Sequence, residues 1–291
     1  MKLITRLDLD GLFSAAMVYK KQAIRSIRFA TPKQIEERVI DIELNDCIVH
    51  LPFHPDASLW FHHHDYELLD DNLMRRVKGK WGPAESTSQL VYEYYNSADF
   101  ESYKPILDEI NRIYSARITE EDIINPDGCM LLYCALDPYL PQDIDLGVKI
   151  IKYICDGKSI EEILEIPLIV EKVLRYYKAN EEYDKELEDH TEMRGNVIVS
   201  DFRGHDKPPR GNRFLVFQKY PEGNVSLRID NAGKKHQLLV SVSKSVFDHS
   251  CETNIGHLMS LFAGGGADGA GTCPLRKANA DEYIERIIEF L

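Results

Sequence analysis

The sequence lacks several features that would assign it to a class at once. It has no run of about 18 apolar residues, so we expect no membrane-spanning helix and no membrane partner. None of its six cysteines lies in a CxxC pair and no signal-peptide pattern opens the chain, so we expect free thiols in a reducing cytoplasm. Positive charge is also scarce, because the chain has 35 Lys and Arg residues but 48 Asp and Glu residues, which gives a net charge of −13. Such a chain is not expected to bind long nucleic acids through non-specific charge.

The first half of the sequence alternates strand and helix patterns. Short apolar strands are expected at residues 3–5, 27–30, 47–51, 59–61 and 130–136. Helical spacing occurs at residues 13–19, 86–95 and 106–114. Strands that alternate with helices favour a parallel sheet with helices on both faces, so the predicted fold class is α/β.

The second half of the sequence changes character. Residues 143–194 have a helical pattern, and the part at 177–192 is mostly charged and polar, which is typical of a helix that bridges two bodies. Strands are then expected at 196–200, 214–217, 225–229 and 238–242, with helices at 254–262 and 281–291, the last capped by Asn279. We therefore predict an α/β domain at 1–176, a polar helical linker at 177–194 and a smaller α+β domain at 195–291.

Two carboxylates follow the first predicted strand. Asp8 and Asp10 flank Leu9 in the turn that leads into the next helix. Ligands of open parallel sheets bind beyond the carboxyl ends of the strands, so both carboxylates can face one cation there. The alternative is a polar turn that caps the following helix.

Half of the ten histidines fall between residues 50 and 64, after two further predicted strands: His50, His54, His62, His63 and His64. Histidine is a common metal ligand that titrates near neutral pH, so this stretch indicates contact with a metal or a phosphate. Successive residues of a strand point to opposite faces, so three consecutive histidines cannot all bind one ion without a bend. We expect His62 to be the one that does not bind. The alternative is a purely structural metal site.

A glycine-rich stretch and a set of basic residues stand out in the second half. Five glycines occur at 264–271, where bare backbone N–H groups can cradle a phosphate or two backbones can touch. A helix stop followed by a flexible turn is the alternative. The basic residues are Arg203, Arg210, Arg213, Lys219 and Lys244, which either face an anion or are simply solvated.

These stretches together resemble the DHH phosphoesterase superfamily, in particular its exopolyphosphatase-like branch related to RecJ-type exonucleases and nano-RNases. Residues 5–12 resemble the opening D-x-D-G motif, residues 45–67 resemble the second motif and the DHH signature, and residues 243–273 resemble the DHH-associated C-terminal domain. The resemblance implies an active site between two domains, where carboxylates and a histidine hold divalent ions that act on a phosphoryl group.

The resemblance assigns roles to individual residues. Metal ligands would be Asp8, Asp10 and His63, together with either Asp46 or His50, which cannot be aligned uniquely. The catalytic residues would be Asp10 and His64, with His64 facing the phosphate. The groups expected to contact substrate are His64, Arg6, Lys244, Gly264, Gly265 and Gly266.

The sequence departs from the family pattern at several of these positions. The leading aspartate of the DHH signature is His62, and two acidic positions further on are Asn111 and Tyr114. The glycine loop ends in Ala267 in place of a histidine, and Asp268 stands where an arginine is usual. Two divalent ions carry +4 against a carboxylate charge of about −2 to −3, so their mutual repulsion is poorly compensated. We therefore predict a divalent metal (Mn²⁺, Mg²⁺ or Zn²⁺) but fewer than two ions, with imidazole ligands favouring Zn²⁺ over Mg²⁺.

The predicted function is metal-dependent hydrolysis of a phosphoester or phosphoanhydride at the interdomain cleft. The expected substrate is a phosphate-containing small molecule or a short oligonucleotide, such as a nucleotide or polyphosphate. The replaced positions predict slow or altered chemistry, because losing one electrostatic stabiliser costs about 100-fold to 1000-fold in rate. The alternative is an inactive member of the fold that binds a nucleotide or a protein partner. A homodimer is also among the expectations.

Overall fold

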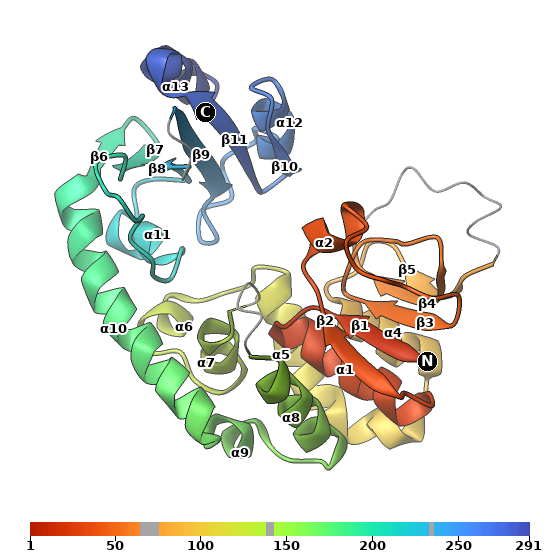
Figure 1. Cartoon of the computed structure of the whole chain (residues 1–291). Helices are drawn as coiled ribbons and strands as arrows, with labels where there is room; N and C mark the ends of the chain where they lie inside the picture. Colours follow the sequence, from red (N-terminus) through yellow and green to blue (C-terminus); the bar gives the residue numbers. More distant parts are fainter. Residues whose placement is uncertain (65–75, 138–142, 233–235) are drawn as a thin grey trace. The chain divides into compact units, whose positions relative to one another are not determined.

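The computed structural model describes residues 1–64, 76–137, 143–232 and 236–291. The chain forms two compact units (Figure 1). Unit 1 comprises Met1–Arg117 and Pro126–Leu174, and unit 2 comprises Ile118–Asn125 and Arg175–Leu291. Within the described ranges, each helix is too short or too polar to span a membrane.

Unit 1 is built on a five-stranded parallel sheet with the order β2-β1-β3-β4-β5. The strands are β1 (Lys2–Thr5), β2 (Ser26–Phe29), β3 (Asp46–Val49), β4 (Ala57–His62) and β5 (Lys78–Trp81). The central strands are buried over nearly their whole length, as expected for a parallel sheet covered on both faces. The predicted α/β class is confirmed, and β5 is a strand that the sequence pattern did not reveal.

The helices of unit 1 cover this sheet (Figure 1). They are α1 (Leu9–Lys21), α2 (Pro32–Glu36), α4 (Thr87–Tyr95), η1 (Ala98–Tyr103), α5 (Lys104–Tyr114), α7 (Gly128–Ala135), α8 (Ile144–Cys155), α9 (Ile160–Leu164) and the start of α10 (Pro167–His190). Helix α1 packs against α4 and α8, and its first turn is fully buried. The turn before α1 follows the carboxyl end of β1 directly, and hydrogen bonds to Asp10 bring the start of α4 next to it.

Two predicted strands are wrong. Residues 130–136 form the helix α7, and residues 214–217 lie in the helical turn around α11 (Leu215–Lys219). Both stretches are continuous apolar runs, and periodicity alone cannot distinguish a buried strand from a buried helix in so short a run. In the second case, Asn212 accepts a hydrogen bond from the backbone N–H of Phe214, which starts the turn.

Unit 2 contains a six-stranded sheet with the order β10-β11-β9-β8-β7-β6. Its strands are β6 (Thr191–Arg194), β7 (Val197–Asp201), β8 (Val225–Asn231), β9 (Gln237–Lys244), β10 (Gly265–Ala267) and β11 (Ala270–Arg276). Its helices are α6 (Glu120–Ile124), α11, α12 (Ile255–Ser260), η3 (Lys277–Asn279), α13 (Ala280–Glu289) and the end of α10. Among the strands of the described residues in this unit, β7 and β8 alone pair in parallel, so the unit is the expected α+β arrangement.

The polar segment at 177–194 forms the second half of α10 and the strand β6. Although α10 is mostly polar, Tyr183 and Leu187 are buried against Phe202 and Phe217 of unit 2. These contacts fix the second half of the helix to the sheet of unit 2.

Candidate active site

Asp8 and Asp10 lie where β1 passes into α1. Asp8 is the N-cap residue of α1 and accepts a hydrogen bond of 2.9 Å from the backbone N–H of Gly11. Asp10 is in the first helical turn and is fully buried. A Cβ atom on Gly11 would lie 2.4 Å from the carbonyl oxygen of Arg6, so only glycine fits this close turn. The turn therefore presents two carboxylates at the carboxyl end of β1.

His50 follows β3 and joins both carboxylates. Its Nε2 lies 3.3 Å from Oδ2 of Asp8, and its Nδ1 lies 2.9 Å from Oδ2 of Asp10. The backbone of His50 has φ of 57°, in the left-handed region that is costly for residues other than glycine. Backbone strain of this kind concentrates at functional sites, where the surrounding structure holds it.

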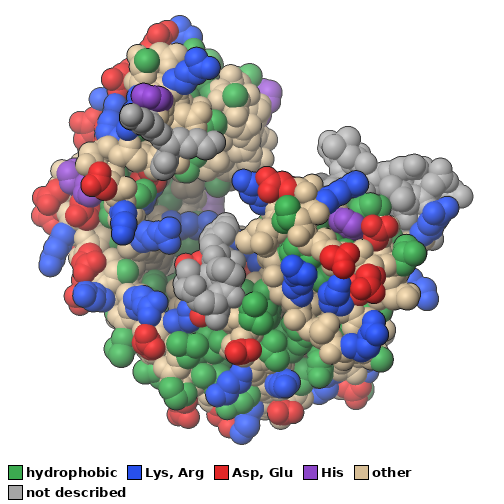
Figure 2. Space-filling view, in the orientation of Figure 1, with side chains coloured by type: hydrophobic (Ala, Val, Ile, Leu, Met, Phe, Trp, Pro, Cys, Tyr) green, Lys and Arg blue, Asp and Glu red, His purple; other side chains and the backbone are tan. Residues whose placement is uncertain are grey.

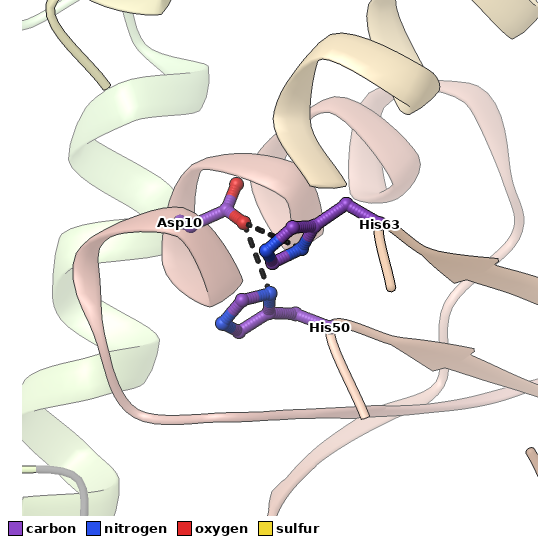
Figure 3. Close-up of side chains that lie close together, drawn as sticks. All are labelled: Asp10, His50 and His63. Carbon is purple, nitrogen blue, oxygen red and sulfur yellow. Dashed lines mark ion pairs between the residues drawn. The ribbon is translucent and has the colours of Figure 1, made fainter. Parts of the chain in front are cut away.

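His63 follows β4 and completes a compact cluster with Asp10 and His50 (Figure 3). Its ring lies nearly parallel to that of His50, with centroids 5.2 Å apart and 5° between planes. Its Nδ1 is 3.8 Å from Oδ2 of Asp10. One ligand atom from each of Asp10, His50 and His63 lies within 4.8 Å of the other two, and all three residues are buried. Two imidazoles and a carboxylate at this separation fit one divalent ion.

The start of α4 holds the cluster together, and the sequence did not single it out. The Thr87 hydroxyl lies 2.9 Å from Nδ1 of both His50 and His63. The backbone N–H groups of Thr87 and Ser88 each donate a 2.8 Å hydrogen bond to the Asp10 carboxylate. The Ser-Thr-Ser run at 86–88 predicts a helix cap, and nothing in that pattern distinguishes a cap that also orients site residues.

Charge in the cluster is strongly coupled. Burial opposes ionisation of Asp10, but the adjacent His50 charge and its hydrogen bond outweigh burial and hold the pKa of Asp10 well below its usual range. Burial alone would lower the pKa of His50, yet the two carboxylates raise that pKa to about 10. Burial lowers the pKa of His63 to about 4, so His63 is neutral near pH 7 and can donate a lone pair to a cation.

Tyr114 occupies one of the positions where the family pattern has an aspartate. Its hydroxyl oxygen accepts a hydrogen bond of 3.2 Å from the backbone N–H of Asp10. Its ring packs edge-on against His50, with centroids 5.7 Å apart. Burial and the negative charges of Asp8 and Asp10 raise the pKa of Tyr114 well above its usual value, so the phenol stays neutral. Asn111, at the other replaced position, accepts a hydrogen bond of 2.6 Å from the hydroxyl of Ser86.

The structure does not bring Asp46 to this cluster. Asp46 begins β3 while His50 follows the end of that strand. Its carboxylate accepts hydrogen bonds of 2.9 Å and 2.8 Å from the backbone N–H groups of Lys2 and Glu43, and it lies 3.2 Å from Nζ of Lys2. Of the two residues that the sequence left open for the second motif, His50 is the one that lies with Asp10 and His63.

The other histidines of the stretch take different positions. His62 ends β4 and its ring stacks on Trp60, with centroids 5.8 Å apart, and it is not one of the three residues whose ligand atoms come together. His64 is exposed, and its ring centroid is 4.0 Å from that of His63. His54 lies outside the cluster and its Nδ1 accepts a hydrogen bond from the backbone of Asp56. Residues 65–67 of the predicted signature region lie outside the described residues.

The remaining predicted substrate groups lie in two places. Arg6 pairs with Asp8, with 3.0 Å between Nε and Oδ2, and is therefore next to the cluster. Lys244 is in unit 2, where its Nζ lies 2.8 Å from Oδ2 of Asp268. Lys244, which is predicted to contact substrate, therefore pairs with Asp268, the residue that stands where the family pattern has an arginine.

The glycine-rich stretch forms the hairpin of β10 and β11 and not an open loop. A Cβ atom on Gly264 would lie 2.0 Å from the carbonyl oxygen of Thr272. A Cβ on Gly256 of α12 would lie 2.4 Å from the carbonyl oxygen of Gly266. These glycines allow close backbone contact, which is one of the two alternatives that the sequence offered. A Cβ atom on Gly265 would meet no other atom within 4 Å.

Known proteins resemble this chain in fold more than in sequence. No protein-family model and no curated protein matches the sequence. Among solved structures, an exopolyphosphatase-related protein from Bacteroides fragilis is 11% identical with a TM-score of 0.53, and covers 99% of this chain and 91% of its own. RecJ with Mn²⁺ from Thermus thermophilus is 10% identical with a TM-score of 0.59 over 98% of this chain and 51% of its own. At these identities the likeness concerns the fold.

The two-unit fold, with a carboxylate–histidine cluster at the strand ends, resembles that of solved DHH-family structures, among them the exopolyphosphatase-related protein, RecJ and a DHH domain. A more specific likeness extends over the whole chain. The pGpG-specific phosphodiesterase PggH from Vibrio cholerae is 27% identical with a TM-score of 0.82, and the match covers 99% of this chain and 98% of that protein.

Proposed function

We propose that this protein hydrolyses the phosphodiester bond of short oligonucleotides, with linear dinucleotides such as pGpG as the preferred class. The observation that supports this proposal is the buried cluster of Asp10, His50 and His63 in a chain that resembles a pGpG-specific phosphodiesterase from end to end. Figure 2 shows acidic and basic side chains interspersed over the visible face of the described parts, an arrangement that favours a small substrate over a long nucleic acid.

Asp10, His50 and His63 would hold the metal, with Asp8 next to them. A divalent ion bound there supplies Lewis-acid stabilisation of the charge that develops on the phosphoryl oxygens. The number and spacing of these side chains support the binding of one ion. Among the described residues of unit 1, one group of three such ligand atoms lies close enough together, and neutral side chains at Asn111 and Tyr114 replace two carboxylates. Loss of that charge disfavours a second dication nearby.

His64 and Arg6 are the groups proposed to contact the phosphate. Burial and the charge of His50 lower the pKa of His64, so the imidazole is neutral near pH 7 and can donate one N–H to a phosphoryl oxygen. Arg6 lies beside the cluster, paired with Asp8, and a guanidinium is a group that binds phosphate well.

The test is a turnover assay on pGpG, longer oligoribonucleotides and polyphosphate with Mn²⁺, Mg²⁺ and Zn²⁺ in turn. We expect cleavage of the dinucleotide, loss of activity in His63→Ala, and unchanged activity in the control variant His249→Ala, whose side chain is exposed in unit 2. His64→Ala is expected to keep the metal and to lose about 100-fold or more in kcat. Dinucleotide hydrolysis that persists in both His63→Ala and Asp10→Asn would contradict the proposed site.

A protein that binds a nucleotide without cleaving it is the second candidate. The observation that favours it is the neutral phenol of Tyr114 at a position where the family pattern has a carboxylate. The same assay separates the two candidates. Retained pGpG binding by calorimetry, with no turnover under any of the three metals, would favour the binding protein and reject the enzyme.

A further inference from the structure

A second group of metal-ligating side chains lies in unit 2 and consists of residues that the proposed active site does not use. Glu186 and His190 are on α10, and His205 follows β7 in the chain. One ligand atom from each lies within 4.8 Å of the other two. We propose that Glu186, His190 and His205 form a binding site for Zn²⁺ or a similar transition-metal ion.

The two histidines converge on one carboxylate. Glu186 Oε2 is 2.8 Å from Nε2 of His205 and 3.4 Å from Nε2 of His190. Glu186 and His190 are four residues apart, which places them on the same face of the helix. Zinc bonds of about 2.0–2.1 Å in tetrahedral geometry separate neighbouring ligand atoms by about 3.3 Å. The separation to His190 already has this value, and that to His205 needs an adjustment of about 0.5 Å.

The site is held in place by the structure around it. Both imidazoles pack edge-on against the buried ring of Phe202, each with a centroid distance of 5.9 Å. The His205 backbone is fixed by its N–H, which donates to the carbonyl of Phe202, and by its carbonyl, which accepts from the side-chain amide of Asn231 on β8. A preformed arrangement lowers the conformational entropy lost when an ion binds.

Solvent access and ligand chemistry favour a borderline transition metal. The side chains of His190, Glu186 and His205 are 39%, 34% and 27% exposed, so an ion can enter and a water can complete the coordination. Figure 2 shows histidine side chains beside acidic ones at the surface near the second half of α10. Two imidazoles and one carboxylate suit Zn²⁺, Ni²⁺ or Cu²⁺ and offer too few oxygen ligands for Ca²⁺ or Mg²⁺. A bound ion would cross-link α10 to the segment after β7.

The experiment measures zinc content in full-length protein without an affinity tag. Protein is stripped with a chelator and dialysed against Zn²⁺ in excess Mg²⁺, and zinc is counted by mass spectrometry. All proteins carry His63→Ala, so the metal of the proposed active site does not enter the difference. We expect His190→Ala and His205→Ala each to lose one zinc per chain relative to this parent. The matched control is His257→Ala, an exposed histidine on α12 of the same unit, which should lose none.

A second measurement guards against misfolding. Glu186→Gln keeps the side-chain size and a hydrogen-bond acceptor, and its fold is compared with the parent by circular dichroism. In Co²⁺-loaded protein, the ligand-field absorption of the parent should weaken in Glu186→Gln, and added Zn²⁺ should raise the unfolding temperature of the parent but not of the variant. Equal zinc content in the parent, His190→Ala, His205→Ala and Glu186→Gln would overturn the proposal, whatever the outcome for dinucleotide hydrolysis.

Discussion

The hydroxyl of Thr87 lies 2.9 Å from Nδ1 of His50 and makes the same contact with His63. One side chain at the start of α4 therefore sets the orientation of two rings that follow different strands. A hydrogen bond to a ring nitrogen fixes the orientation of an imidazole, and groups of this kind affect metal affinity strongly.

Replacement of this hydroxyl should weaken metal binding. Thr87→Val preserves the shape of the side chain but removes both contacts, and we expect Mn²⁺ affinity to fall about 10-fold to 100-fold. Thr87→Ser retains a hydroxyl and should stay within a few-fold of the parent. Calorimetric titration of Mn²⁺ into metal-free protein measures the affinity of each variant. Equal affinities for the valine variant and the parent would show that the hydroxyl does not position the rings.

Metal binding should release a proton near neutral pH. Burial alone would lower the pKa of His50, but Asp8 and Asp10 raise it to about 10, so His50 is protonated in the metal-free protein. A histidine binds metal only as the neutral ring, so uptake must displace about one proton per chain. Apparent affinity should rise with pH up to about 10 and then level off. Calorimetry in buffers of different ionisation enthalpy counts the protons. Uptake without proton release would mean that His50 is not a ligand.

Asp46 should contribute to stability and not to metal binding. Burial opposes its ionisation, but hydrogen bonds from the Glu43 and Lys2 backbones and the Lys2 ammonium outweigh burial and lower the pKa of Asp46. A lowered carboxylate pKa stabilises the fold above the unfolded-state value and loses this effect as pH falls through the folded-state value. Asp46→Asn should therefore lower the free energy of unfolding by about 1.5–3 kcal/mol near neutral pH, with a difference that shrinks in acid.

The measurement for this variant is urea unfolding across pH, with bound metal determined in parallel. His50→Ala is the contrasting variant, since it should lose metal. If Asp46→Asn lost its metal while it kept its stability, the placement of Asp46 away from the ligand cluster would be contradicted.

Tyr114 offers a way to change the number of bound ions. Tyr114→Asp restores a carboxylate beside Asp8 and Asp10, which should destabilise the metal-free protein by like-charge repulsion and raise bound Mn²⁺ from one ion toward two. Tyr114→Phe removes only the hydroxyl and should leave the count at one. Mass spectrometry of native protein counts the ions. A Tyr114→Asp protein that still holds one Mn²⁺ would show that charge balance alone does not set the number.

Much of the fold follows from local pattern. The D-x-D-G turn and the short apolar strands predict the parallel sheet, because burial on both faces leaves a continuous apolar signature. The apolar run at 130–136 shows the limit of that signature. It forms the helix α7, since a buried helix and a buried strand share the same composition over so few residues.

The candidate site is predictable only in part. Asp8, Asp10 and His63 are conspicuous by residue type and by their place at strand ends. The choice between Asp46 and His50 could not be made from sequence, because the two positions flank the same strand and only three-dimensional structure shows which end faces the cluster. The sequence also gives no sign that Thr87 contacts two histidines. A threonine at the start of a predicted helix is typical of ordinary helix capping, so its residue type alone does not indicate a role in the site.

The parallel order of β1, β3 and β4 has a consequence for biosynthesis. Asp10, His50, His63 and Tyr114 meet only after three strands and α5 have docked in register. A nascent polypeptide whose synthesis has stopped before α4 lacks the hydroxyl and backbone donors that orient the cluster. Acquisition of the ion should therefore follow the synthesis of α4 and α5 during translation, and a fragment that ends before α4 should not capture it.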